Sequence, residues 1–263
     1  DARRIFKLGN HEERFEDFGA DLAKYRDPIG REAHGLLQSA PDLPHPAGID
    51  FIDRSYALAD WAAVHFQKRF YLGLVSSHLL AVAMGAVFIL YSEMLDRPWL
   101  AGLFLALFGT GLVLHLVGEK REWHRKYLDY RALAEGLRVQ TYWALAGVVD
   151  ARAAEFAYDN FLQKQDVDLA WIRHVMRSAS LRRQRGVEPD PRWVPWVADQ
   201  WVGRRDGGGQ LAYYGSKAHT RAETYRRTVL LGAIALWTGI LMAVFLGLFA
   251  QRLDDATLLL LLI

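Results

Sequence analysis

The chain has 263 residues, a formal net charge of +2 and no cysteine. The balanced charge gives no reason to expect nucleic acid as a partner, and the lack of cysteine excludes disulfides, thiolate metal sites and cysteine nucleophiles. Hydrophobic residues make up 52% of the chain, but they gather in long runs between highly charged segments. This separation is typical of a membrane protein.

Residues 1–49 are predicted to form cytoplasmic helices and a linker. Apolar residues recur at helical spacing over residues 2–26, which predicts one or two short amphipathic helices with a break near Gly9 and Asn10. Residues 27–48 contain Asp-Pro, Leu-Pro-His-Pro and several glycines, so we expect a loop or linker there. Because the chain starts without methionine and stops within an apolar run, we also expect it to be part of a longer protein.

Residues 50–118 are predicted to form a helix that leads into a transmembrane hairpin. Asp50 or Asp53 can cap a helix over residues 50–69, and no breaker separates that helix from the apolar run at residues 70–91. A second run, at residues 99–117, follows the polar turn SEMLDRP, and neither run holds Lys, Arg, Asp or Glu. About 20 apolar residues span a hydrocarbon core. The alternative is a buried hairpin of a soluble protein, in which two such runs in tandem are rare.

Residues 119–227 are predicted to form a cytoplasmic helical insert. The segment 119–148 has no proline, and we expect the second span to continue into it without interruption. It carries an apolar stripe at helical spacing, made of Trp123, Tyr127, Tyr130, Ala134 and Leu137. Further along we expect two helices over 150–183, a loop over 184–193, a short tryptophan-rich helix over 194–205, a flexible break at 206–209 and a helix over 210–227.

Residues 228–263 are predicted to form a second hairpin, of which the last span is incomplete. A third apolar run covers residues 228–250, and a fourth begins at Leu258 after the polar turn QRLDDAT. The fold class is therefore an all-α membrane protein with two hairpins, four spans and a cytoplasmic insert. The positive-inside rule places both termini and the insert in the cytoplasm, because basic residues flank the spans on that side: Lys68, Arg69, Lys120, Arg121, Arg125, Lys126, Arg221, Arg226 and Arg227.

Small residues recur every fourth position in the spans, and such stripes let helices approach closely in lipid. The candidate packing residues are Gly73, Ala81 and Gly85 in the first span, with Ser77 between them, and Ala235, Gly239, Ala243 and Gly247 in the third. The second span has a weaker version in Gly102, Ala106 and Thr110. Packing within one four-helix unit and contact between subunits both remain open. Four spans are too few to enclose a wide aqueous path, so a pore would need a homo-oligomer.

Polar residues within the spans are the candidate pore-lining groups, because polar side chains in hydrocarbon are costly and often functional. They are Ser76, Ser77, His78, Thr110, His115 and Thr238. The alternative is that serine and threonine bond back to carbonyls of their own helix, and that His115 lies in water at the cytoplasmic interface.

Motifs for enzymatic chemistry are not recognisable, so we predict no enzyme, no cofactor and no metal. The glycines at 207–209 lack the lysine and the serine or threonine that follow a phosphate-binding loop. The acidic and imidazole groups of Glu119, Glu122 and His124 do not match a two-histidine metal motif. Solvated surface charge is the simpler interpretation of these three residues.

Four segments together resemble known bacterial membrane proteins. They are ALADWAAVHFQKRF, KYLDYRALAEGLRVQTYW, NFLQKQDVDLAWIRHVMR and WVADQ with AYYGSKAHTRAE. The chain is similar to proteins with two transmembrane hairpins and an N-terminal SLOG-type nucleotide-sensing domain akin to the sensor of TRPM channels, and to SLATT-type two-helix effectors. The resemblance implies an effector of the bacterial inner (plasma) membrane, in defence or stress signalling. It also implies a sensor domain before Asp1 that binds a nucleotide.

We therefore predict an oligomeric membrane effector or channel-like protein, gated by a cytoplasmic domain. Its partners would be the lipid bilayer and further copies of the chain, and not nucleic acid. Sensor binding would bias the packing of the helices over residues 50–69, 119–148 and 210–227. The alternatives are a non-conducting membrane anchor or assembly platform, and a small-solute transporter. A transporter is less well supported because the spans show no broken helix or midplane charge.

Overall fold

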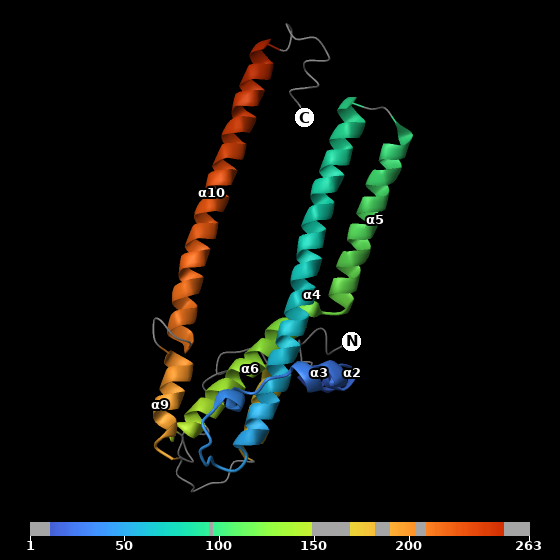
Figure 1. The fold of residues 1–263 in the computed structure, drawn as a ribbon. Helices are drawn as coiled ribbons and strands as arrows, with labels where there is room; N and C mark the ends of the chain where they lie inside the picture. Colours follow the sequence, from blue (N-terminus) through green and yellow to red (C-terminus); the bar gives the residue numbers. More distant parts are fainter. Residues whose placement is uncertain (1–10, 95–96, 149–168, 182–189, 204–208, 250–263) are drawn as a thin grey trace. The chain divides into compact units, whose positions relative to one another are not determined.

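A computed structural model describes residues 11–94, 97–148, 169–181, 190–203 and 209–249 (Figure 1). Every regular element in these residues is a helix, which confirms the all-α prediction for this part of the chain. The chain divides into two units, Asp1–His78 with Leu112–Trp201, and Leu79–Gly111 with Val202–Ile263. The elements in order are α2 (His11–Lys24), α3 (Arg26–Glu32), the 3₁₀-helix η1 (Leu36–Ser39), α4 (Ile49–Ile89), the π-helical turn η2 (Leu90–Met94), α5 (Pro98–Lys120), α6 (Trp123–Leu145), α8 (Ala170–Leu181), α9 (Trp193–Val197), the π-helical turn η4 (Ala198–Val202) and α10 (Gly209–Phe249).

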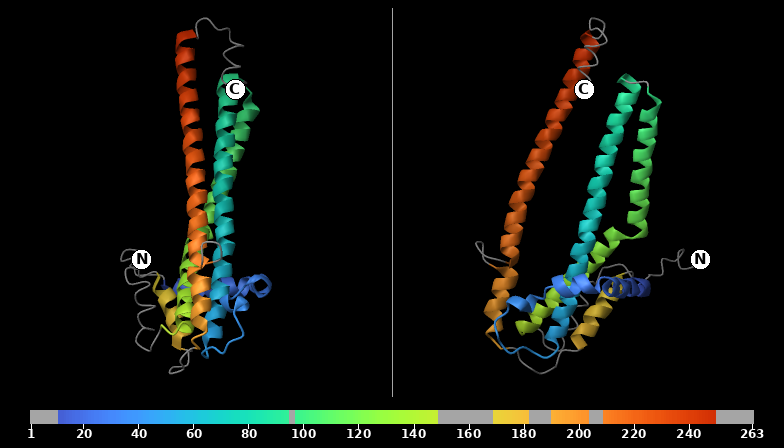
Figure 2. Two further views of the ribbon diagram at one scale, coloured as in Figure 1. Left: turned by 60° about the vertical axis from the view of Figure 1, so that its left-hand side comes forward. Right: turned by 45° about the vertical axis from the view of Figure 1, so that its right-hand side comes forward.

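The first unit has an apolar core to which α2, α4, α6 and α8 all contribute. Helix α6 packs against α8, and the two lie beside the first part of α4 in both views of Figure 2. The predicted stripe on α6 is confirmed, since Tyr130, Ala134 and Leu137 are at most 1% exposed. Trp171 of α8 is equally buried and packs edge-on against Tyr130. Because the first part of α4 belongs to this core, one end of that helix is fixed in packed protein.

The loop or linker expected over residues 27–48 contains two short helices, α3 and η1, with loop around them, and the segment packs against the rest of the unit. Pro28 lies in the first turn of α3, where a missing N–H costs nothing. The buried carboxylate of Asp53 accepts hydrogen bonds from the N–H groups of Leu36 and Leu37, at 2.6 and 3.3 Å, and holds η1 against α4. A Cβ at Gly35 would lie 2.1 Å from Asp53 Oδ2, so this close approach requires glycine.

A second, smaller core joins this segment to the end of α6 and to α9. Its buried residues are Ile49, Tyr142, Ala144, Leu145, Trp193 and Val197. The indole N–H of Trp193 donates to the carbonyl of Pro44 at 3.0 Å, which anchors the loop before α4. The tryptophan-rich helix expected over 194–205 is confirmed as α9 followed by η4, with residues 204–205 outside the described part. Helix α8 confirms the second of the two helices expected over 150–183.

Three segments in the described residues are long and apolar enough to cross a membrane: Ile49–Ser92, Pro98–Leu145 and Gly209–Phe245. The predicted continuity of the helix before the first run with that run is confirmed, since α4 is one helix of 41 residues. The same holds for α10, which joins residues 210–227 to the third run without interruption. The apolar part of α4 is exposed, with Leu72 at 70% and Val82 at 72%, whereas its first part is buried. This contrast is what a helix that leaves packed protein for hydrocarbon requires.

The apolar parts of α4 and α5 form an antiparallel hairpin (Figure 1). Phe88 and Phe104 face each other across it, with ring centroids 6.3 Å apart. The polar turn is shorter than expected, because η2 extends helical structure to Met94 and α5 begins at Pro98, a position that proline favours. Several expectations lie outside the described residues: the break near Gly9 and Asn10, the first helix of 150–183, most of the loop at 184–193, the break at 206–208 and the fourth apolar run.

Candidate functional site

The chain turns a corner between α5 and α6, so the continuous helix expected over 119–148 is wrong. Helix α5 ends at Lys120, α6 begins at Trp123, and Glu122 between them has a φ of 49°. Glu122 is the one non-glycine residue with a positive φ in the described part of the chain. A left-handed residue other than glycine costs about 1–2 kcal/mol. Neither of the two corner residues, Arg121 and Glu122, is glycine or proline, so contacts beyond the local backbone hydrogen bonds are expected to help maintain the corner.

The indole ring of Trp123 lies close to two glycines, one on α4 and one on α5. A Cβ at Gly73 of α4 would lie 3.7 Å from this ring, and a Cβ at Gly118 of α5 would lie 3.8 Å from it. The next residue, His124, stacks on Phe70 of α4 with ring centroids 4.4 Å apart. These contacts hold the start of α6 against α4.

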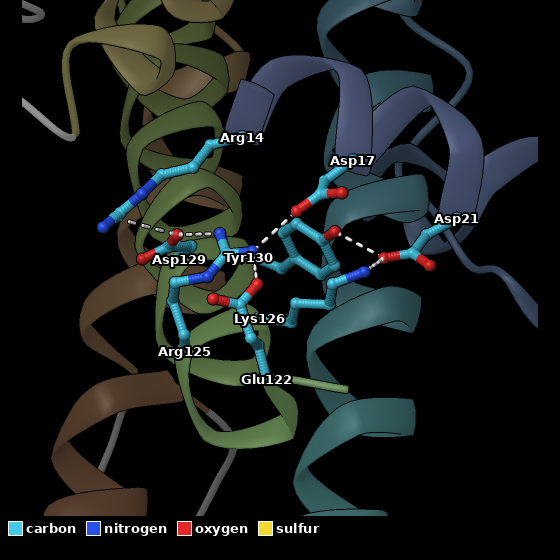
Figure 3. A network of polar contacts seen from close by, with 8 residues as sticks. All are labelled: Arg14, Asp17, Asp21, Glu122, Arg125, Lys126, Asp129 and Tyr130. Carbon is cyan, nitrogen blue, oxygen red and sulfur yellow. Dashed lines mark hydrogen bonds and ion pairs between the residues drawn. The ribbon is translucent and has the colours of Figure 1, made fainter. Parts of the chain in front are cut away.

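A polar network beside the corner centres on Arg125 (Figure 3). Its guanidinium donates to Asp17 of α2 at 2.6 Å, to Asp129 at 3.2 Å and also to Glu122. Arg14 of α2 contacts the same carboxylate of Asp129 at 3.4 Å. Burial works against the charge of Arg125, but the hydrogen bonds to Glu122 and Asp17 outweigh it and raise the pKa of Arg125. Arg125 therefore ties α2 to the corner residue and to α6.

A second branch of the network joins α2 to α6 through Asp21, one turn after Asp17 on α2. Asp21 accepts from Lys126 Nζ and from the Tyr130 hydroxyl, each at 2.7 Å (Figure 3). Burial, together with the hydrogen bond to Asp21, raises the pKa of the Tyr130 phenol, so Tyr130 remains a donor. Both branches join one face of α2 to one face of α6. We define the α2 latch as the eight residues of this network: Arg14, Asp17, Asp21, Glu122, Arg125, Lys126, Asp129 and Tyr130.

The α2 latch was not predicted from the sequence, although a signal for it exists. Asp17 and Asp21 are four residues apart, and so are Arg125 and Asp129, and Lys126 and Tyr130. Residues four apart share one helix face. The signal is an acidic pair on one helix face, Asp17 and Asp21, and the basic residues Arg125 and Lys126 on another helix. Only the fold brings these two helices together.

The candidate pore-lining residues bond mainly to their own helices. Ser77 donates to the carbonyl of Gly73 at 2.9 Å, and Thr110 donates to that of Ala106 at 2.8 Å. His78 Nδ1 lies 2.7 Å from the carbonyl oxygen of Leu74. His115 lies 3.8 Å from Glu119 on the same helix. Of the six candidates, Ser77 and His115 line one groove, and Ser76, His78, Thr110 and Thr238 are not among its lining residues.

The small-residue stripes have few contacts within the described chain. A Cβ at Gly85 or Gly239 would meet nothing within 4 Å. Ala81, Ala235 and Ala243 are exposed, and the surroundings of Gly247 lie outside the described residues. Contact between subunits through these stripes stays a prediction.

The described residues contain no group of three or more His, Cys, Asp or Glu side chains that could hold a metal ion. Glu119, Glu122 and His124 therefore form no such group, and the contacts of Glu122 are ionic within the α2 latch.

His65 of α4 lies in an aromatic cluster with Tyr25, Trp61 and Phe66. Its ring stacks on Trp61 at 4.7 Å and lies 4.5 Å from Tyr25, and its Nε2 has no hydrogen-bond partner among the described residues. Burial, and then the nearby charge of Arg69, lower the pKa of His65 from its usual 6.5, and the carboxylates of Asp21 and Glu32 oppose this shift only in part.

His65 is expected to make the fold sensitive to mild acid. In the unfolded chain the imidazole takes up a proton near pH 6.5, whereas the folded chain resists it to a lower pH. The stability contributed by neutral His65 is therefore fully present above about pH 6.5, and it is lost as the pH falls from there towards the folded pKa. We expect Tm to fall less between about pH 7.5 and 5.5 in His65→Phe than in the wild type. His34→Phe, at an exposed histidine, is the control, and equal pH dependence in all three proteins would contradict the prediction.

Residues 54–148 match the model of a family described as "Protein of unknown function (DUF4231)". The DUF4231 segment begins within α4 and ends just after α6, so it contains the hairpin, the corner and Arg125. Helix α2, which supplies Asp17 and Asp21, lies outside it. No curated protein and no solved structure matches the chain.

Proposed function

We propose that this chain is an oligomeric membrane effector or channel-like protein whose membrane helices are controlled by its packed helical unit. The observation that carries the proposal is the dual character of α4. Its first part lies in the core with α2, α6 and α8, and its second part is apolar and exposed. A change of packing around the first part would therefore act on a helix that continues without interruption into the apolar run.

The α2 latch is the element through which a signal would act. Arg125 joins α2 to Glu122, the left-handed residue between α5 and α6, so movement of α2 changes the support of the corner directly. Because α2 and α4 contact residues at the corner, loss of these contacts would favour an alternative, a straight α5–α6 helix, and two discrete packings are what a switch requires. The basic residues at the helix ends support a cytoplasmic location for this unit. The resemblance to SLATT- and SLOG-linked proteins supports an upstream nucleotide sensor in a bacterial inner membrane protein.

The test is ion flux from proteoliposomes that contain the purified full chain. We expect Arg125→Met, in which the latch is broken, to release entrapped potassium at least about tenfold faster than the wild type, a change of roughly 1.4 kcal/mol in the closed–open equilibrium. Arg192→Met is the matched control, because Arg192 pairs with Asp190 on the surface. Flux equal to that of protein-free liposomes for every variant would overturn the proposal.

A non-conducting membrane anchor is the second candidate, and one observation favours it. Ser77 and Thr110 donate hydrogen bonds to carbonyls of their own helices, and His78 Nδ1 lies 2.7 Å from the carbonyl oxygen of Leu74. These side chains therefore do not require a water-filled path. Ser77→Leu and His78→Leu separate the two functions. An anchor keeps its activity in both variants, whereas a pore lined by these residues changes its conductance.

A further inference from the structure

A groove of about 490 Å³ lies between α4, the end of α5 and the start of α6. Gly73 and Gly118 in its lining leave room beside Trp123. One part of the lining is apolar and consists mainly of Phe70, Leu74, Leu114 and Trp123. The other part is polar and includes Ser77, His115, Glu119, Glu122, His124 and Arg125. The groove therefore has an apolar wall and a polar end.

The two ends of the groove correspond to the two layers of a bilayer leaflet. The run at residues 99–117 has no acidic or basic residue apart from His115, and the charged residues Glu119, Lys120, Arg121 and Glu122 follow it. With that run in hydrocarbon, the apolar wall lies level with acyl chains and the two carboxylates lie level with lipid headgroups. This step rests on the membrane insertion that is part of the proposed function, and not on conduction.

The charges at the polar end favour a cationic group. Arg125 contacts three carboxylates, so its charge is matched within the α2 latch. The Glu119 side chain is 70% exposed, and its carboxylate lies 3.8 Å from the imidazole of His115. A primary ammonium can donate hydrogen bonds to a carboxylate, and aromatic rings such as that of Trp123 also attract it.

We infer that this groove binds one phospholipid with a primary ammonium headgroup, phosphatidylethanolamine. Its ammonium contacts Glu119, and one acyl chain lies along Leu74, Leu114 and Trp123. Choline headgroups lack N–H donors for Glu119, and phosphatidylglycerol carries no ammonium group that could pair with this carboxylate.

Quenching of Trp123 fluorescence by brominated lipids tests the inference. The full chain is reconstituted in phosphatidylcholine vesicles that contain an equal fraction of brominated phosphatidylethanolamine, phosphatidylcholine or phosphatidylglycerol. Subtraction of the Trp123→Phe signal isolates Trp123 among the nine tryptophans. We expect the apparent affinity for the groove, measured by quenching of Trp123, to be about two- to fivefold higher for brominated phosphatidylethanolamine than for the other two lipids. This is the range of a partly solvated ion pair. Glu119→Gln should abolish this preference.

Glu223→Gln is the matched control, because Glu223 forms a similar i,i+4 pair with His219 on α10, at 3.9 Å, outside the groove. It should keep the preference. Equal quenching by all three lipids, a preference for phosphatidylglycerol, or a preference that survives Glu119→Gln would overturn the inference. Quenching of Trp99 and Trp237, within the apolar runs, reports membrane insertion separately. Where Trp123→Phe folds poorly, native mass spectrometry of wild type and Glu119→Gln counts the phosphatidylethanolamine retained.

Discussion

Replacing Arg125 with methionine is expected to lower the free energy of unfolding by about 3 kcal/mol, because it removes one of the two arginines that contact the buried carboxylate of Asp129 and also the arginine that pairs with Asp17 and Glu122. Asp129 has a side chain only 6% exposed, and Arg125 and Arg14 together hold its charge. Burial already raises the pKa of Asp129 against the pull of both arginines, so loss of Arg125 makes the ionised form still less favourable. Thermal unfolding in detergent, followed by circular dichroism, should show a drop in Tm of roughly 6–12 °C.

Two further variants show whether the drop in Tm comes from the loss of the bridging guanidinium of Arg125. Arg125→Lys should have an intermediate Tm, because a compact ammonium cannot bridge Asp17, Glu122 and Asp129 as a planar guanidinium does. Arg192→Met should leave Tm unchanged, because Arg192 and Asp190 form an exposed local pair. An Arg125→Met protein as stable as the wild type would show that the latch does not hold α2 to α6.

In the proposed function, a region outside the DUF4231 segment acts on a region within it through the α2 latch. Asp17 and Asp21 are on α2, and their partners Arg125, Lys126 and Tyr130 are on α6. A sensor or partner that displaces α2 would remove both acidic residues at once. The proposed signal therefore needs no ligand contact with the hairpin itself.

The sequence was sufficient for the long helices, because local signals and burial agree there. No breaker interrupts residues 49–89, and α4 forms as one helix. The stripe with Tyr130 and Leu137 likewise places these residues in the core. In both cases helical periodicity and packing favour the same structure.

The sequence was insufficient where distant contacts override a local pattern. Proline and glycine over residues 27–48 indicated a linker, but Asp53 and Trp193 supply hydrogen bonds that fix this segment. At the α5–α6 corner the local pattern favoured a helix, but Trp123 and Arg125 contact partners on α4 and α2. Neither set of contacts can be read from residues that are near in the sequence.

The corner yields the second large expected effect: Trp123→Ala should shift α5 and α6 towards one straight helix. Loss of the indole beside Gly73 and Gly118 removes roughly 2 kcal/mol of packing from the bent form, less than the cost for a fully buried tryptophan because Trp123 is half-buried. That loss changes the bent–straight equilibrium about thirtyfold. The straight form also relieves the left-handed conformation of Glu122.

Spin labels can measure this change directly, because the chain has no cysteine of its own. Labels at Leu112 and Leu128, both exposed, are 16 residues apart across the corner, and a straight helix would separate their Cα atoms by about 24 Å. We expect a shorter distance in the wild type and a new population near this value in Trp123→Ala. Labels at Leu211 and Arg227, 16 residues apart on the uninterrupted α10, should give the straight-helix distance in both proteins. If the Leu112–Leu128 distance is the same with and without Trp123, that side chain does not maintain the corner, and the switch has to depend on the α2 latch alone.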